Sequence, residues 1–99
     1  MANSFTFSPA GPSVLVGVTA VQVPCTAGSG VTGFSFRVRC LVAAYLTWGS
    51  TSGVTAVGGP GVNTLGMAAG GVETFAFPAA SWFIANVAAA FEISPGDGM

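Results

Sequence analysis

The chain has 99 residues, enough for one domain; 52% of them are hydrophobic and only 5% are charged, against about 25% charged residues in an ordinary soluble domain. This balance excludes intrinsic disorder, which requires low hydrophobicity and high charge. The net charge is −1, with two arginines and no lysine, so the chain lacks the basic surface that attracts nucleic acid or anionic membranes.

No stretch of the sequence has the length of a membrane span. The nearest candidate is residues 79–91, which Ser81 and Asn86 interrupt, whereas a spanning helix needs about 20 consecutive apolar residues. The N-terminal sequence MANSFTFSP has neither the basic start nor the apolar core of a secretory signal. We therefore expect no membrane span and no targeting segment. With so few charges we expect association with partners that cover the surface.

Glycine and proline residues punctuate the whole chain, and the runs between them are rich in Val, Phe, Thr and Ala. Such spacing is typical of a sandwich or barrel of short strands. Residues 4–8, SFTFS, alternate phenylalanine with polar side chains, which predicts a strand. Pro9 and Pro12 are expected to end it, since neither can donate a hydrogen bond to a neighbouring strand.

The second apolar run, residues 14–23, is rich in valine, but its valines change parity between Val18 and Val21. This change predicts either a bulge in one strand or two short strands with a bend. Gly17 is consistent with a bend or a close approach of two segments. Residues 25–33 contain several glycines and are expected to form a hairpin loop.

The clearest strand is residues 34–40, FSFRVRC, in which apolar and polar side chains alternate strictly. The predicted polar face holds Ser35, Arg37 and Arg39. A turn is expected at residues 41–44. A further strand, YLTW, is expected at residues 45–48, and Gly49 would stop it.

The middle of the chain is predicted to be richer in loops. We expect a turn at residues 50–53, a short strand at residues 54–57 and a long loop at residues 58–71, GGPGVNTLGMAAGG. A loop of that length is a candidate functional or interface segment. Residues 72–77, VETFAF, alternate again and predict a strand that the following proline ends.

The C-terminal part raises one question between helix and strand. Residues 81–88 are apolar on both faces, as a central strand would be, whereas the alanines favour a helix over residues 79–90. The Trp, Phe, Ile and Val side chains favour the strand. A final strand is expected at residues 91–94, closed by Pro95 and Gly96.

Seven or eight short strands without a convincing helix predict one all-β domain over residues 1–99. The expected architecture is an antiparallel β-sandwich, either jelly-roll or immunoglobulin-like.

The residue types needed for most catalysis are missing. Without histidine or lysine, no Ser-His-Asp or Cys-His arrangement and no Schiff-base lysine can form within one chain. The glycine-rich residues 28–30 and 58–61 do not open a helix, so they do not predict a phosphate site. We therefore expect no enzymatic activity and no cofactor.

The two cysteines, Cys25 and Cys40, have no zinc-motif spacing and no histidine to complete a metal site. They form either a disulfide, worth about 3 kcal/mol for a loop of this length, or two buried free thiols. The second interpretation is favoured, because Cys40 belongs to the apolar face of a strand whereas Cys25 follows a proline at a strand end.

The few charged residues admit a catalytic and a structural interpretation. Glu73 and Glu92 could serve as the acid and base of a glycosidase. The structural interpretation is favoured, in which one or two ion pairs join them to Arg37 and Arg39 between strands or at subunit contacts. Alternatively, the two arginines share one strand face and could bind an acidic partner surface.

The aromatic residues Trp48, Trp82 and Tyr45 also have two interpretations. An exposed ring could stack on a sugar, as in a glycan-binding module. Core packing or subunit contact is favoured, because the polar groups of a typical sugar site are scarce in this chain.

Residues 34–99 carry four motifs in a fixed order: FRVRCLVAAYLTWG, GGVETF, WFIANVA and ISPGDG. In this order they resemble small structural proteins of tailed phages. In that group an arginine-bearing strand leads to an aromatic strand that ends in glycine, followed by a "pG-x-E-x-F" segment, an apolar strand and an ending like "I-t-P-G-E-G". The corresponding segments here are residues 36–49, 70–75, 82–88 and 93–98. The sequence departs from the pattern where Ala68 and Ala69 replace the usual proline.

This resemblance implies a virion structural protein, most simply a capsid cement or decoration module that stabilises neighbouring subunits. The alternative is a tail-fibre adaptor or a receptor- or glycan-binding module of a phage. The implied partners are the major capsid protein or tail components and further copies of the chain, with a trimer as the expected oligomer. Direct nucleic-acid or membrane binding is not expected. The candidate interface residues are Arg37, Arg39, Glu73, Glu92, Trp48 and Trp82.

Overall fold

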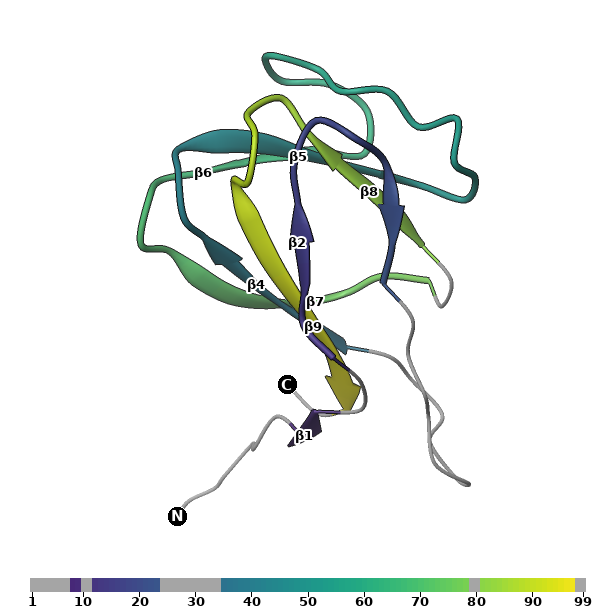
Figure 1. Cartoon of the computed structure of the whole chain (residues 1–99), viewed down its shortest axis with the longest axis vertical. Helices are drawn as coiled ribbons and strands as arrows, with labels where there is room; N and C mark the ends of the chain where they lie inside the picture. Colours follow the sequence, from purple (N-terminus) through teal and green to yellow (C-terminus); the bar gives the residue numbers. More distant parts are fainter. Residues whose placement is uncertain (1–7, 10–11, 24–34, 79–80, 98–99) are drawn as a thin grey trace.

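The computed structural model describes residues 8–9, 12–23, 35–78 and 81–97, and within them all the regular secondary structure is β-strand (Figure 1). The strands are β1 (Ser8–Pro9), β2 (Val14–Val16), β3 (Val21–Gln22), β4 (Ser35–Cys40), β5 (Ala44–Gly49), β6 (Thr64–Met67), β7 (Val72–Ala76), β8 (Trp82–Ala85) and β9 (Phe91–Asp97).

The strands form two antiparallel sheets. Sheet A has the order β1-β9-β4-β7, and β2 pairs with β9 on the same flank as β1; sheet B has the order β3-β8-β5-β6. The chain crosses from one sheet to the other at every connection from β2 to β9 except the β5–β6 hairpin. Eight strands ordered β2-β9-β4-β7 and β3-β8-β5-β6 form a jelly roll. The predicted all-β sandwich is therefore confirmed, in its jelly-roll form.

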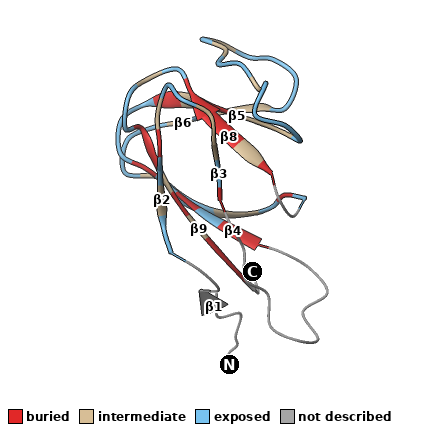
Figure 2. Ribbon diagram, turned by 45° about the vertical axis from the view of Figure 1, so that its right-hand side comes forward, coloured by how far each residue is buried: buried red, intermediate tan, exposed pale blue. Residues whose placement is uncertain are grey.

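The core lies between the two sheets and is built largely from phenylalanine. Phe36 of β4, Phe83 of β8 and Phe91 of β9 have no exposed surface. The ring centroid of Phe36 lies 5.7 Å from those of both Phe77 and Phe83, so these rings join sheet A to sheet B. Figure 2 shows the buried positions concentrated along the strands, whereas the connections are mostly exposed or intermediate.

Strand β4 has the alternation that the sequence predicts, with Phe36 and Val38 fully buried and Arg37 and Arg39 exposed. Ser35 is an exception, because it is buried rather than exposed. The valine-rich run is divided into β2 and β3, which belong to different sheets. The bend interpretation of this run is thus confirmed.

Strand β8 settles the question between helix and strand. Residues 82–85 form a strand between β3 and β5, so the helix alternative is wrong. Ala85, one of the alanines that favoured a helix, belongs to β8. Ala88, Ala89 and Ala90 lie in the turn after it, where Ala89 adopts a positive φ of 51°. A turn of this kind cannot continue as a right-handed helix.

Two predictions for the middle of the chain are wrong. Residues 54–57 form no strand. Val54 instead packs against Gly49 of β5, where an added Cβ would lie 3.3 Å from the Val54 side chain. The predicted loop at residues 58–71 contains β6. Its Gly66 lies beneath the ring of Tyr45, where an added Cβ would come within 2.9 Å of the ring. The glycine that suggested a loop is thus what lets β6 pair with β5.

Strand β9 continues through Pro95 and Gly96, which were predicted to close it. In the described register Pro95 is paired only with Phe36 of β4, because pairing with β2 ends at Ile93 and pairing with β1 begins at Gly96. A proline is tolerated where one flank needs no donor. Pro9, predicted to end the first strand, is also paired, and the rest of that strand prediction falls outside the described residues, as does the predicted loop at residues 25–33.

The outer faces of the two sheets differ in exposure. On sheet B, Thr47 and Ile84 point away from the core yet are only 6% and 8% exposed. The segment between β5 and β6, which packs on Gly49 through Val54, lies on this side of the sheet. Strand β4 of sheet A instead presents Arg37 and Arg39 to solvent on its outer face. Sheet A therefore offers the open surface on which three of the predicted site residues meet, Arg37, Arg39 and Glu92.

Candidate interaction surfaces

A row of four exposed side chains crosses the outer face of sheet A. Directly opposed residues in an antiparallel sheet point to the same face, and the register aligns Leu15 of β2, Glu92 of β9, Arg39 of β4 and Val72 of β7. Leu15 is 56% and Val72 is 48% exposed. The row thus places a pair of opposite charges between two exposed aliphatic side chains.

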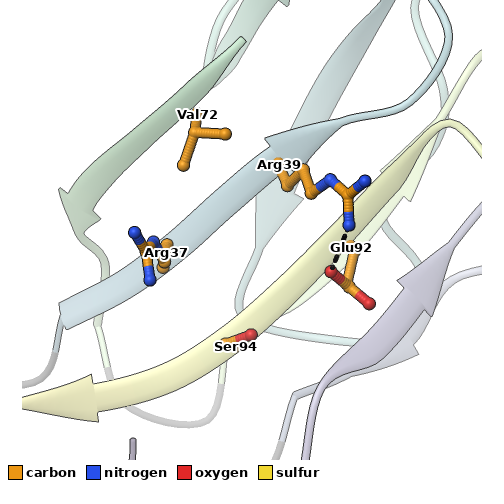
Figure 3. A pocket seen from close by; sticks show the side chains of 5 residues that line it. All are labelled: Arg37, Arg39, Val72, Glu92 and Ser94. Carbon is orange, nitrogen blue, oxygen red and sulfur yellow. Dashed lines mark ion pairs between the residues drawn. The ribbon is translucent and has the colours of Figure 1, made fainter. Parts of the chain in front are cut away.

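Arg37 belongs to the neighbouring row, between Ser94 of β9 and Thr74 of β7. The Ser94 hydroxyl is hydrogen-bonded to that of Ser13 at 2.8 Å. The two rows enclose a shallow hollow of about 280 Å³ (Figure 3). Its lining residues are Arg37, Arg39, Val72, Glu92 and Ser94.

One predicted ion pair is present on this face. Arg39 Nη1 lies 3.6 Å from Glu92 Oε1, and the two side chains are 58% and 42% exposed (Figure 3). An exposed pair of this kind contributes about 0–1 kcal/mol. Within the described residues Arg37 has no carboxylate within ion-pair distance, so the hollow carries one uncompensated positive charge.

Glu73 is not on the arginine face. It lies opposite Val38 of β4, whose side chain is fully buried, whereas Arg37 and Arg39 point outward. Glu73 is nevertheless exposed, because β7 is the edge strand of sheet A. Glu73 and Glu92 thus lie on opposite faces of the sheet. A charge on the inward side of an edge strand also disfavours pairing with a further strand.

The two tryptophans lie in different environments. Trp48 lies opposite the buried Phe83, and its ring centroid is 4.9 Å from that of Phe77. It therefore packs on the aromatic core and is half-buried. Trp82 lies on the outer face of sheet B, opposite Gly49 and Gln22, and is also half-buried.

A second hollow, of about 510 Å³, lies beside Tyr45 at one end of sheet B. The backbone N–H of Tyr45 donates to Asn86 Oδ1 at 2.8 Å, which ties β5 to the turn after β8. The hollow is lined by Ala43, Ala44, Tyr45, Gly66, Met67, Ala68 and Asn86. None of these residues carries a charge.

Four connections between the sheets converge at one end of the sandwich: residues 17–20, 41–43, 68–71 and 86–90. Their backbones are hydrogen-bonded to one another or to the adjoining strand ends. Ala90 accepts from Leu41 N at 2.7 Å and donates to Val16 O at 3.0 Å, and Gly70 N donates to Cys40 O at 2.8 Å. We call this surface the uncharged end, because none of its residues is Asp, Glu, Lys or Arg.

Apolar side chains are exposed at the uncharged end. Val18 is 58%, Leu41 38% and Val42 45% exposed. Three charged residues lie two positions along the chain from these connections: Arg39, Glu73 and Glu92. Arg39 and Glu92 pair with each other. Sequence reasoning missed this surface, because its four segments are separated along the chain and only the sheet order brings them together.

No protein-family model, curated protein or solved structure matches this chain. The described part of the chain contains only strands and connections, so it holds no helix that is long and apolar enough to cross a membrane. The described residues also contain no group of three or more His, Cys, Asp or Glu side chains that could hold a metal ion.

Cys40 is a buried free thiol at the end of β4. Its Sγ donates to the carbonyl oxygens of Val42 at 3.2 Å and Met67 at 3.6 Å. Burial raises the pKa of this thiol above its ordinary value. The free-thiol interpretation is thus confirmed for Cys40, and Cys25 lies outside the described residues.

The raised pKa of Cys40 predicts a loss of stability in alkali. As the pH rises through 9.0, the ordinary pKa of the thiol, the unfolded chain releases this proton while the folded chain keeps it. The unfolded state then binds fewer protons, so the free energy of unfolding falls by up to about 1.4 kcal/mol per pH unit until the folded thiol ionises.

Urea denaturation at several pH values between about 8 and 10 measures this slope. Cys40→Ala is the control, because it removes the thiol and leaves the other titrating groups in place. The variant should show a shallower decline than the wild type. Equal slopes in the two proteins would contradict the assignment to Cys40.

Proposed function

We propose that the chain is a non-enzymatic structural protein of a tailed-phage virion, acting as a capsid cement or decoration module that stabilises neighbouring subunits. The observation that carries the proposal is the uncharged end, where exposed Val18, Leu41 and Val42 are backed by small apolar residues. Large contiguous apolar patches are rare on monomeric soluble proteins and mark interaction sites. Their burial contributes about 25 cal/mol per Å², from which the costs of association are subtracted.

Two further observations support this assignment. The jelly roll recurs in viral capsid and lectin domains, which is support by analogy, since one fold hosts many functions. The resemblance to tailed-phage structural proteins covers the segments from β4 to β9. The proposed partners are further copies of the chain and the major capsid protein or tail components, and the proposed location is the virion.

A tail-fibre adaptor or glycan-binding module is the second candidate, favoured by the half-buried Trp82 on the outer face of sheet B and by the hollow beside Tyr45. Trp48 is a poorer sugar platform, because it packs against Phe77. A glycan array distinguishes the two roles. Binding that is lost in Trp82→Ala would favour the glycan-binding module over cement.

The assembly role is tested on particles of the phage that encodes the chain. Quantitative mass spectrometry should find the wild-type chain in a fixed ratio to the major capsid protein. Val42→Lys should reduce its occupancy by at least about tenfold, because a lysine at the uncharged end would be desolvated without a partner charge; tenfold corresponds to about 1.4 kcal/mol.

Val62→Lys is the matched control, since Val62 lies between β5 and β6 and is 86% exposed. Its occupancy should equal that of the wild type. If mass spectrometry finds no copy of the chain in intact wild-type particles, the assembly role is refuted. Equal occupancy of the two lysine variants would refute the part assigned to the uncharged end.

A further inference from the structure

Two of the four charged side chains that the structure describes are left without an ion-pair partner. Arg39 and Glu92 pair with each other, whereas Arg37 and Glu73 pair with no other described residue. Both are exposed and they have opposite signs. Among the side chains that the structure describes, one cation and one anion are thus unpaired, and they lie on adjacent strands of the same sheet.

Arg37 and Glu73 are directed to opposite faces of the sheet. Arg37 lies opposite Thr74 and points outward, while Glu73 lies opposite Val38 and points to the core side of the edge strand. A shift of β7 by one residue would bring Glu73 to the arginine face. The same shift would turn Phe75 away from the core, because it moves every side chain of the strand to the other face.

We propose that Glu73 of one copy forms an ion pair with Arg37 of a second copy. The carboxylate would enter the hollow beside Arg37, where Val72 and Ser94 form part of the wall. Charge complementarity selects this occupant. With Arg39 already paired to Glu92, a pair between Arg37 and Glu73 would leave every charged side chain that the structure describes with a partner of opposite sign. Two copies could not meet arginine face to arginine face as readily, since each hollow carries a net positive charge.

The contact is therefore heterologous: the edge strand of one copy meets the outer face of sheet A of the next. Heterologous contacts close into rings when the rotation between copies permits it, which is compatible with the expected trimer. Val72 and Leu15 are exposed on that face and supply apolar surface around the ion pair.

A charge-reversal cycle on the purified chain tests the pair. Sedimentation velocity over a range of concentrations should detect self-association of the wild type. Arg37→Glu and Glu73→Arg should each weaken it by at least about tenfold, because each places like charges in contact. The double variant should return to within about threefold of the wild type. Added salt should weaken association of both the wild type and the double variant.

Val62→Glu is the control for added negative charge, and its association should match that of the wild type. Circular dichroism verifies that each single variant is folded, and recovery in the double variant excludes a general loss of structure. A wild type that stays monomeric at every concentration would overturn the pair. A double variant that self-associates no more strongly than the single variants would also overturn the pair. That result is expected if Arg37 binds an acidic surface of another protein.

This inference rests on the proposed assembly role, since it requires copies of the chain to meet, but the two fail separately. The charge-reversal cycle uses the purified chain alone. Absence of the chain from virions would refute the assembly role and would leave the result of the charge-reversal cycle unchanged. A failed cycle would refute the Arg37–Glu73 pair while the chain could still be found in particles.

Discussion

Replacing Phe36 by alanine is expected to lower the free energy of unfolding by about 3–5 kcal/mol. Phe36 is fully buried, and its ring contacts Phe77 and Phe83, so the substitution opens a cavity where the two sheets meet. Small domains have a total stability of only about 5–15 kcal/mol. At about 4–8 °C per kcal/mol, a loss of at least about 3 kcal/mol should lower the midpoint of thermal unfolding by at least about 12 °C.

Urea denaturation at a fixed protein concentration measures this effect, because self-association would make stability depend on concentration. Val62→Ala is the control. It also removes apolar atoms, but from a side chain that is 86% exposed, so its effect should stay within about 0.5 kcal/mol. A loss below about 1 kcal/mol for Phe36→Ala would show that the aromatic cluster does not hold the sheets together.

Gly17→Ala should destabilise the fold by about 2–3 kcal/mol, although the change adds only one methyl group. A Cβ at this position would lie 2.8 Å from the backbone nitrogen of Ala89. The Gly17 carbonyl also accepts a hydrogen bond from Ala85 N at 2.8 Å, so the turn cannot move away without weakening it. Insertion of extra atoms into a packed region typically costs about 1–3 kcal/mol.

Gly59→Ala is the matched control, because no atom lies within 4 Å of the added Cβ. Its effect on the free energy of unfolding should stay within about 0.5 kcal/mol. Denaturation of both variants under identical conditions decides the comparison. If Gly17→Ala is as stable as Gly59→Ala, the contact between the two turns does not constrain residue 17.

The strands with strict alternation were predictable from the sequence, and β4 is the clearest case. Its buried phenylalanine and valine alternate with arginines, which matches the period of a pleated strand. Strand β6 was missed because Gly66 resembles a loop residue. A glycine is needed at this position because the ring of Tyr45 in the neighbouring strand leaves no room for a Cβ. Long-range contacts of this kind are absent from local patterns.

The candidate site was predictable in its residues but not in its pairing. Opposite charges in strand-like segments indicated ion pairs, and Arg39 with Glu92 is one of them. Register decides which charges meet, and it places Glu73 beside Val38 instead of an arginine. The uncharged end depends on sheet order in the same way, since its four connections are far apart in the sequence.

The place of β9 in sheet A has a consequence for synthesis on the ribosome. This strand lies between β4 on one side and β1 and β2 on the other, yet it emerges after every other described strand. Until then, among the strands that the structure describes, β2 has no pairing partner and β4 can pair only with β7. Sheet A therefore cannot be completed until β9 has been synthesised, and before that point the nascent chain exposes apolar strand edges. Pulse proteolysis of stalled chains that end before residue 91 should find them far more susceptible than the full-length chain.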